Sequence, residues 1–167
     1  MPGPGPRPAA ASRSRARRAS FSAVAAGLAA AGLALSGCAT AVTVPPPASA
    51  PTLCAELVAS LPSRVAGQEQ RRTEPESPAT AAWGDPPISV RCGVETPAAY
   101  QPTSQLFSVN GVDWLAEELS SGFRFTTVGL PVNTEVTVPD AYAPEADVIA
   151  QLSVPISRAI PQAEPPV

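Results

Sequence analysis

The stretch "QLFSVNGVDWLAEEL", residues 105–119, contains the strongest local folding signal in the chain. Asn110 and Gly111 stand between two runs rich in aromatic and β-branched residues, and this dipeptide favours the two-residue type I′ turn of a β-hairpin. The turn fixes a register with two apolar cross-strand pairs on one face, Phe107 with Trp114 and Val109 with Val112. The hairpin therefore has an apolar face that the rest of the fold has to cover.

Trp114 has an alternative interpretation as a platform on which a ligand stacks. A tryptophan that faces a phenylalanine across a hairpin contributes a large apolar area, and residues in that setting belong more often to a core. The pattern therefore favours a core position for Trp114.

Two further β-segments flank this hairpin in the sequence. Residues 123–138, "FRFTTVGLPVNTEVTV", predict a second hairpin that turns near Gly129 to Pro131. Residues 88–94, "ISVRCGV", predict a strand. Residues 64–80 are polar and contain two prolines, so they predict an exposed loop.

The chain also predicts two helices. Residues 52–62, "TLCAELVASLP", have leucines at near-helical spacing after Thr52, which is a candidate N-cap. Residues 143–161 predict a C-terminal helix with Pro144 in its first turn, and Pro155 is expected to kink or split it. The expected apolar side of this helix consists of Val148, Ile149, Leu152, Ile156 and Ile160.

Together these segments predict an α+β fold. A small antiparallel sheet, made of the two hairpins and a disulfide-tied strand, packs against an N-terminal and a C-terminal helix. Its predicted extent, residues 52–162, is about 110 residues, which is enough for one hydrophobic core.

The N-terminal segment has the layout of an export signal. The first 20 residues carry only basic charges, and Phe21 to Leu35 form an uncharged run of about 15 residues. Leu35 to Cys38, "LSGC", resembles the lipobox at which bacterial lipoproteins are cleaved and acylated. We therefore expect a signal peptide at residues 1–37, a diacylglycerol on Cys38, and a domain held at the extracytoplasmic side of the cell membrane.

Two alternatives to this anchor stay open. Phe21 to Val44 contains no charge and is long enough to remain as an uncleaved transmembrane helix with the arginines inside. In the other alternative the protein is secreted and Cys38 is an incidental thiol. Both anchored interpretations place the residues from 45 onward outside the cytoplasm.

Cleavage before Cys38 changes the charge of the chain. Five of the eleven arginines lie in the signal, which leaves six against fourteen acidic residues and a net charge of −8. A domain of this charge without lysine repels phosphate backbones, so nucleic acid is not expected as a partner. Residues 38–51 are expected to form a Pro/Ala-rich tether behind the lipid, and residues 163–167 a short tail.

Two cysteines remain once Cys38 is assigned to lipid. In an oxidising compartment an even pair usually forms a bridge, so we expect a disulfide between Cys54 and Cys92. A zinc site needs more ligands than two distant thiols and the chain has no histidine, while a redox pair would normally have C-x-x-C spacing. The bridge therefore ties the first helix to the strand at residues 88–94.

The composition excludes most kinds of catalysis. Without histidine and lysine there is no Ser-His-Asp triad, Ser-Lys dyad, Schiff base or histidine-based metal centre. Only carboxylates remain, and two of them could act as a glycosidase pair if held about 5 to 9 Å apart. Solvated surface acids explain the same residues, Asp85, Asp113, Glu117 and Glu118, equally well. We predict no enzyme, no catalytic residue, no cofactor and no metal.

The loop "WGDPP", residues 83–87, is the candidate interaction surface. Trp83 and Pro86, with Asp85 between them, could form a rigid apolar loop that contacts another protein, and Arg91 could pair with a carboxylate of that partner. In the alternative, Trp83 covers the core and Arg91 pairs with an acid on a neighbouring strand.

Residues 81–94, "AAWGDPPISVRCGV", followed by "VNGVDWL" at residues 109–115, resemble an actinobacterial family of cell-envelope proteins, the domain of unknown function 3515. The resemblance extends from about Leu53 to Ile160. It implies a membrane-associated protein or lipoprotein with paired cysteines, and it implies no activity.

Two functions follow as hypotheses. The first is a non-enzymatic envelope lipoprotein that binds a protein partner, and we favour it because about 110 residues leave little volume for a pocket beside the core. The second is a lipoprotein that holds a small apolar or glycan ligand.

Overall fold

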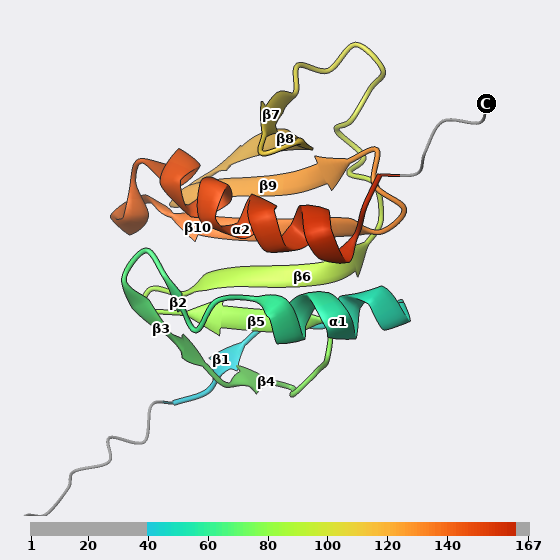
Figure 1. Cartoon of the computed structure of the whole chain (residues 1–167). Helices are drawn as coiled ribbons and strands as arrows, with labels where there is room; N and C mark the ends of the chain where they lie inside the picture. Colours follow the sequence, from blue (N-terminus) through green and yellow to red (C-terminus); the bar gives the residue numbers. More distant parts are fainter. Residues whose placement is uncertain (1–39, 163–167) are drawn as a thin grey trace, which may run out of the picture. The chain divides into compact units, whose positions relative to one another are not determined.

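The computed structural model describes residues 40–162, so Cys38, the rest of residues 1–39 and the tail 163–167 lie outside the described part. The fold is α+β, with two helices and an eight-stranded antiparallel sheet (Figure 1). The helices are α1 (Thr52–Ser60) and α2 (Glu145–Ala159), with a short 3₁₀ helix, η1 (Asp140–Tyr142), before α2. The strands are β1 (Val42–Thr43), β2 (Arg64–Val65), β3 (Gln68–Arg71), β4 (Thr73–Glu74), β5 (Thr80–Trp83), β6 (Ile88–Val94), β7 (Phe107–Val109), β8 (Val112–Leu119), β9 (Gly122–Val128) and β10 (Asn133–Pro139).

The Asn-Gly hairpin forms as the sequence predicts. Asn110 and Gly111 both have positive φ, 51° and 78°, as a type I′ turn requires. The register between β7 and β8 pairs Phe107 with Trp114 and places Val109 opposite Val112. Local turn chemistry therefore sets this part of the sheet.

The two predicted hairpins join into one sheet. β8 continues to Leu119 and pairs along its length with β9, so Glu117 and Glu118 lie inside a strand. β10 then pairs with both β9 and β6, which gives the strand order β2-β3-β5-β6-β10-β9-β8-β7. The sheet is therefore larger than the predicted two hairpins and one strand.

The prediction of an exposed loop at residues 64–80 is wrong. This segment contains β2, β3 and β4 and the first residue of β5. Ala66 and Gly67, with φ of 49° and 74°, make a two-residue turn between β2 and β3. The side chains of β3 are polar and none of them is buried, so the alternation that identifies a half-buried strand is absent from this segment.

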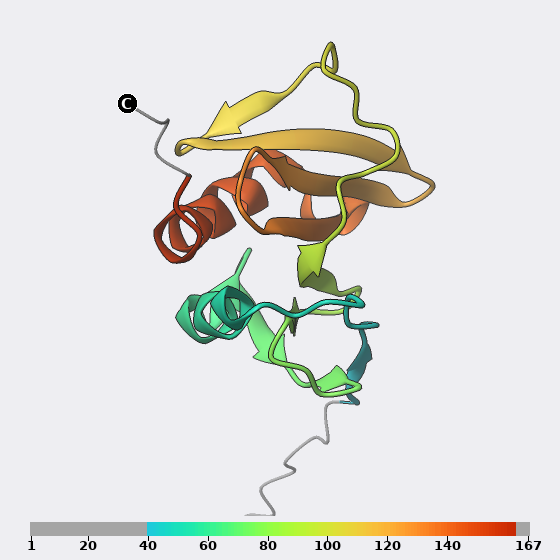
Figure 2. The same ribbon diagram turned by 90° about the vertical axis from the view of Figure 1, so that its right-hand side faces the viewer.

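Both helices pack on the same face of the sheet (Figures 1 and 2). We call this the helix face and the opposite side the outer face. α1 starts after Pro51 without a side-chain cap, so the expected capping by Thr52 is wrong. α2 runs unbroken through Pro155. The residues predicted for its apolar side are all buried, which holds the helix on the sheet despite the missing backbone donor of Pro155.

The core lies between the helices and the sheet. Trp114 is fully buried, which confirms its core position, and its indole Nε1–H donates to Ser153 Oγ on α2 at 3.1 Å. The Ser153 hydroxyl in turn donates to the Ile149 carbonyl at 2.7 Å. The polar atom of a large buried side chain is thereby satisfied, as burial requires.

The predicted disulfide is present. Cys54 on α1 and Cys92 on β6 are bonded, with their Cα atoms 5.4 Å apart, and both residues are fully buried. The bridge joins α1 directly to the middle of the sheet, next to β10.

Residues 40–51 do not form the free tether that their composition predicts. β1 pairs in parallel with β4, and Val42 and Val44 are buried against Ala82 on the outer face. The described part of the predicted tether is therefore packed on the domain.

Candidate functional site

Trp83 belongs to the core and takes no part in the predicted interaction surface. Its side chain is fully buried on β5, and its Nε1–H donates to the Pro62 carbonyl at 3.0 Å. Only Asp85 and Pro86 of that loop are exposed. A large indole with a satisfied N–H gains more from burial than from exposure. The alternative interpretation, in which Trp83 covers the core, is therefore correct.

The turn after Trp83 packs against the segment before α2. The Tyr142 hydroxyl donates to the Pro86 carbonyl at 2.7 Å, and burial raises the pKa of that phenol above 10.0. Gly84 has a φ of +72°, and a Cβ there would meet the Tyr142 hydroxyl and the Gln68 side chain. This turn is therefore a packed connection in which glycine is needed.

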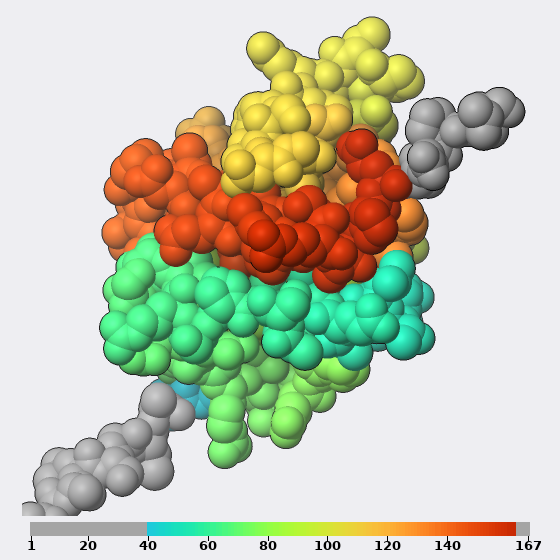
Figure 3. All heavy atoms as spheres, viewed as in Figure 1, coloured from blue at the N-terminus to red at the C-terminus, as the bar shows by residue number. Residues whose placement is uncertain are grey.

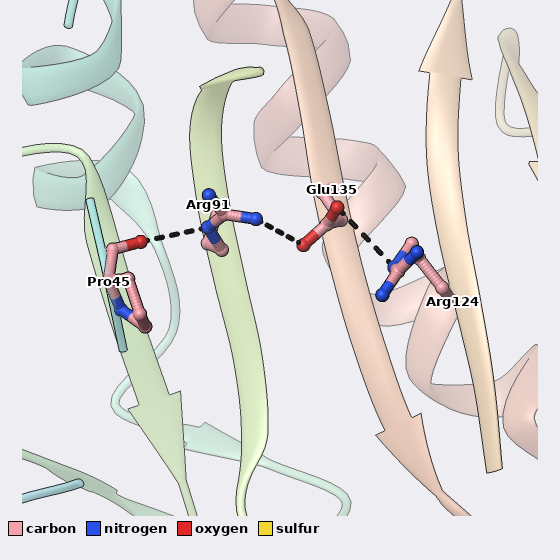
Figure 4. Close-up of polar contacts among 4 residues, drawn as sticks. All are labelled: Pro45, Arg91, Arg124 and Glu135. Carbon is pink, nitrogen blue, oxygen red and sulfur yellow. Dashed lines mark hydrogen bonds and ion pairs between the residues drawn. The ribbon is translucent and has the colours of Figure 1, made fainter. Parts of the chain in front are cut away.

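Arg91 takes part in a charged ladder across the outer face (Figure 4). Its Nη1 lies 3.0 Å from Glu135 Oε1 on the neighbouring strand β10, and its Nε–H donates to the Pro45 carbonyl at 2.9 Å. Arg124 Nε on β9 lies 3.5 Å from Glu135 Oε2, an ion-pair distance too long for a good hydrogen bond. Arg91 thus pairs with Glu135 of its own sheet, which confirms the alternative interpretation of this residue.

The four carboxylates considered for catalysis do not converge. Asp85 lies in the β5–β6 turn, while the other three lie on β8, and two strands separate β6 from β8. On β8, Glu117 faces Arg124 in register and Glu118 faces Phe123, so these two neighbours point to opposite faces. Among residues 40–162, no three potential ligands gather into a metal-binding group.

The best-formed apolar surface lies where β7, β8 and β9 meet the N-terminal half of α2. A groove of about 480 Å³ opens there, and we call it the Phe107 groove. Its lining includes Phe107, Val109, Phe123 and Phe125 from the sheet and Ala146 and Ile149 from α2. In Figure 3 the yellow surface of the β7 region meets the red surface of α2.

Phe107 is the most exposed aromatic side chain of this groove. It is 42% exposed, and within the described residues it is the one large hydrophobic side chain that is exposed. Its ring packs edge-on against Phe125 with centroids 6.1 Å apart, and the Phe125 centroid lies 6.0 Å from that of Phe123. The three rings therefore form a continuous aromatic wall with one side open to solvent.

Carboxylates flank this groove. Glu145, in the first turn of α2, belongs to its lining, and the exposed Glu118 lies opposite Phe123 in the β8–β9 register. No arginine is among the described residues that line it. A second groove of about 440 Å³ between α1 and α2 is lined by Glu56, Gln151 and Arg158 among others, and its mixed lining makes it a weaker apolar site.

Sequence reasoning identified the Phe107–Trp114 pair but not the groove. The hairpin register gives both residues the same face, yet α2 covers the tryptophan completely and leaves the phenylalanine 42% exposed. The extent of α2 over the sheet is a tertiary property with no local signal.

The chain belongs to the DUF3515 family of proteins of unknown function. The family model matches residues 19–165, which include all the strands and both helices described above. This confirms the family resemblance seen in the "RCGV" and "VNGVDW" motifs. Comparisons with curated proteins and with solved structures found no significant match. The part of this DUF3515 chain that the structure describes contains no helix long and apolar enough to cross a membrane.

Proposed function

We propose that this protein is a non-enzymatic lipoprotein, anchored through Cys38 at the extracytoplasmic side of the cell membrane, whose Phe107 groove binds a segment of another envelope protein. The observation that carries the binding site is the exposed aromatic side chain in an apolar groove. An exposed aromatic ring that continues into an apolar groove, with carboxylates at its rim, is a common mark of an interaction surface.

The charges around the groove define the partner. Glu118 and Glu145 flank it, and residues 38–167 carry six arginines against fourteen acidic residues, a net charge of −8. A complementary partner therefore offers an apolar side chain for the groove with lysine or arginine beside it. The proposed partner is therefore a basic, apolar segment of an extracytoplasmic protein.

A small apolar ligand is the second candidate occupant. The volume of about 480 Å³ lies within the range of roughly 300 to 1,000 Å³ that is usual for small-molecule sites. The flanking carboxylates favour the protein segment, because a purely apolar ligand gains nothing from them.

Photocrosslinking from the groove tests the proposed partner. With p-benzoylphenylalanine in place of Phe107 in the native envelope, we expect a crosslink to a protein segment that contains an apolar residue next to lysine or arginine. Phe107→Ala should weaken binding of that segment about tenfold or more, because aromatic anchors carry about 1.4 kcal/mol or more. Glu145→Gln should weaken binding more at low salt than at high salt, because salt screens the charge that it removes.

Ser108 provides the matched control. It is exposed and adjacent in β7, but its side chain points to the other side of the strand. The same crosslinker at Ser108 should not capture the segment. Adducts to lipid or to a small molecule alone from position 107, or equal capture from position 108, would contradict a protein partner in the groove.

The anchor has its own test. In a Cys38→Ala variant the acyl acceptor is lost, and we expect the protein to leave the membrane fraction, because the acyl chains are its proposed durable anchor. Fractionation of cells that express wild type or variant, followed by washes without detergent, measures this. Full retention of the variant would favour the uncleaved helix over the lipid.

A further inference from the structure

The first described residues form a strap on the outer face of the sheet. The Val42 N–H donates to the Arg72 carbonyl at 2.8 Å, and the Val44 N–H donates to the Glu74 carbonyl at 3.1 Å. Val42 is 7% exposed and Val44 2% exposed, and both pack on Ala82. We call residues 40–49 the strap.

Side chains from the sheet hold the strap at two points. The Arg71 guanidinium donates to the Thr40 carbonyl and also to the Gly84 carbonyl. Further along, Arg91 donates to the Pro45 carbonyl while it pairs with Glu135 (Figure 4). The strap is therefore fixed by backbone pairing, apolar burial and two arginines.

Gly93 lets the strap lie close to β6. It has a φ of +93°, and a Cβ at this position would meet the Ser49 carbonyl oxygen and the Pro51 ring. This close approach requires glycine, and it extends the packing from Thr40 to the start of α1. Within residues 40–51, the chain therefore stays on the domain up to the point where α1 begins.

We propose that the strap holds the domain directly against the membrane, with the edge formed by β1, β3 and β4 toward the headgroups and the Phe107 groove facing away. This inference rests on the proposed N-terminal anchor. Cys38 is two residues from Thr40, whose carbonyl Arg71 holds, so a lipid on Cys38 lies within about 7 Å of chain length from the domain. An uncleaved helix before the strap would place the same edge at the membrane.

The position of the groove follows from the strand order. β3 and β7 are six strand steps apart in the sheet, and at about 4.8 Å per step this is about 29 Å. β1 and β4 lie beyond the β3–β5 side, while β7 forms the opposite edge (Figures 1 and 2). The groove is therefore directed toward partners in the envelope space, and lipid headgroups do not cover it.

Energy transfer to the bilayer tests this orientation. The acylated mature chain, residues 38–167, is reconstituted into phosphatidylcholine vesicles that contain a headgroup-labelled acceptor lipid. A donor dye is attached to Arg72→Cys, next to the strap, or to Gln105→Cys, just before β7; both positions are exposed. We expect the distance of closest approach to be shorter by about 20 Å or more at position 72 than at position 105.

Variants of the strap provide a matched pair. Val42→Asp/Val44→Asp places charges at buried positions and should release the strap, so the difference between the two dye positions should shrink. Thr43→Arg adds a charge to the same strand at an exposed position opposite Glu74 and should leave the difference unchanged. The Cys54–Cys92 disulfide and the circular dichroism spectrum confirm that each variant is folded.

The outcomes separate the two proposals. Equal distances at positions 72 and 105 in a chain that stays on the vesicles would overturn the orientation and leave the anchor standing. A wild-type chain that does not stay on the vesicles would overturn the anchor, and the orientation with it. An orientation unaffected by Val42→Asp/Val44→Asp would overturn the role of the strap.

Discussion

Loss of the Cys54–Cys92 disulfide is expected to lower the free energy of unfolding by about 2 to 5 kcal/mol. The bridge closes a sequence separation of 38 residues, so its removal returns conformational freedom to the unfolded chain. α1 has only nine residues, and isolated helices of that length are marginal in water. Of these nine, only Cys54 and Leu57 are buried, so the bridge is a major attachment of the helix.

Thiol titration and denaturant melts measure this effect. The oxidised domain should show no free thiol from Cys54 or Cys92 either folded or denatured, and reduction should shift the denaturant midpoint down. A Cys54→Ala/Cys92→Ala variant without reductant should melt close to the reduced protein. Two titratable thiols in protein purified oxidised from its own envelope, or identical melts in both redox states, would contradict the bridge.

Truncation of Trp83 should produce an effect of similar size. Trp83→Ala removes a fully buried indole from β5, and we expect a loss of about 3 to 5 kcal/mol in the free energy of unfolding. Trp83→Phe keeps most of the apolar volume but leaves the Pro62 carbonyl without its donor, so a smaller loss of about 1 to 3 kcal/mol is expected. Chemical denaturation with circular dichroism measures both.

Phe107→Ala is the control for this comparison. Phe107 is aromatic too, but it is 42% exposed at the edge of the sheet, so its truncation should cost clearly less than that of Trp83. If Trp83→Ala left the stability unchanged within about 0.5 kcal/mol, the residue would behave as a surface side chain and the core position would be wrong.

These two tests also separate stability from binding. Trp83 and the disulfide hold the core together, whereas the Phe107 groove is proposed to act on a partner. Suppose that Phe107→Ala keeps most of the wild-type stability but no longer binds the partner identified by crosslinking. The groove then serves binding and not stability.

Several features of the fold follow from short-range sequence signals. The Asn110-Gly111 turn set the register of β7 and β8 because a type I′ turn needs two residues that tolerate positive φ. The apolar spacing of residues 148–160 predicted which side of α2 is buried. The pairing of Cys54 with Cys92 followed from the number of cysteines once Cys38 was assigned to lipid.

Other features depend on contacts between distant parts of the chain. β3 is polar, and β1 and β4 have two residues each, so none of them has an apolar alternation that a sequence can reveal. β3 exists because it pairs with β2 and β5. β1 and β4 exist because the backbone of residues 42–44 finds partners near residues 72–74 and because Ala82 leaves an apolar surface to cover. For this reason residues 40–49, which were expected to be part of a free tether, pack on the domain as the strap.

The sequence by itself determined the turn chemistry, the helical periodicity, the cysteine pairing and the family, since each depends on residues that are near in the chain or on simple counts. Only the tertiary structure decided that Trp83 is buried while Phe107 is exposed. Both are aromatic residues in or beside predicted β-segments, and their positions in the sheet separate them. β5 lies in the interior of the sheet, whereas β7 is its edge strand and has a neighbouring strand on one side only. Burial is a property of the neighbours that a fold brings together, and no local pattern specifies it.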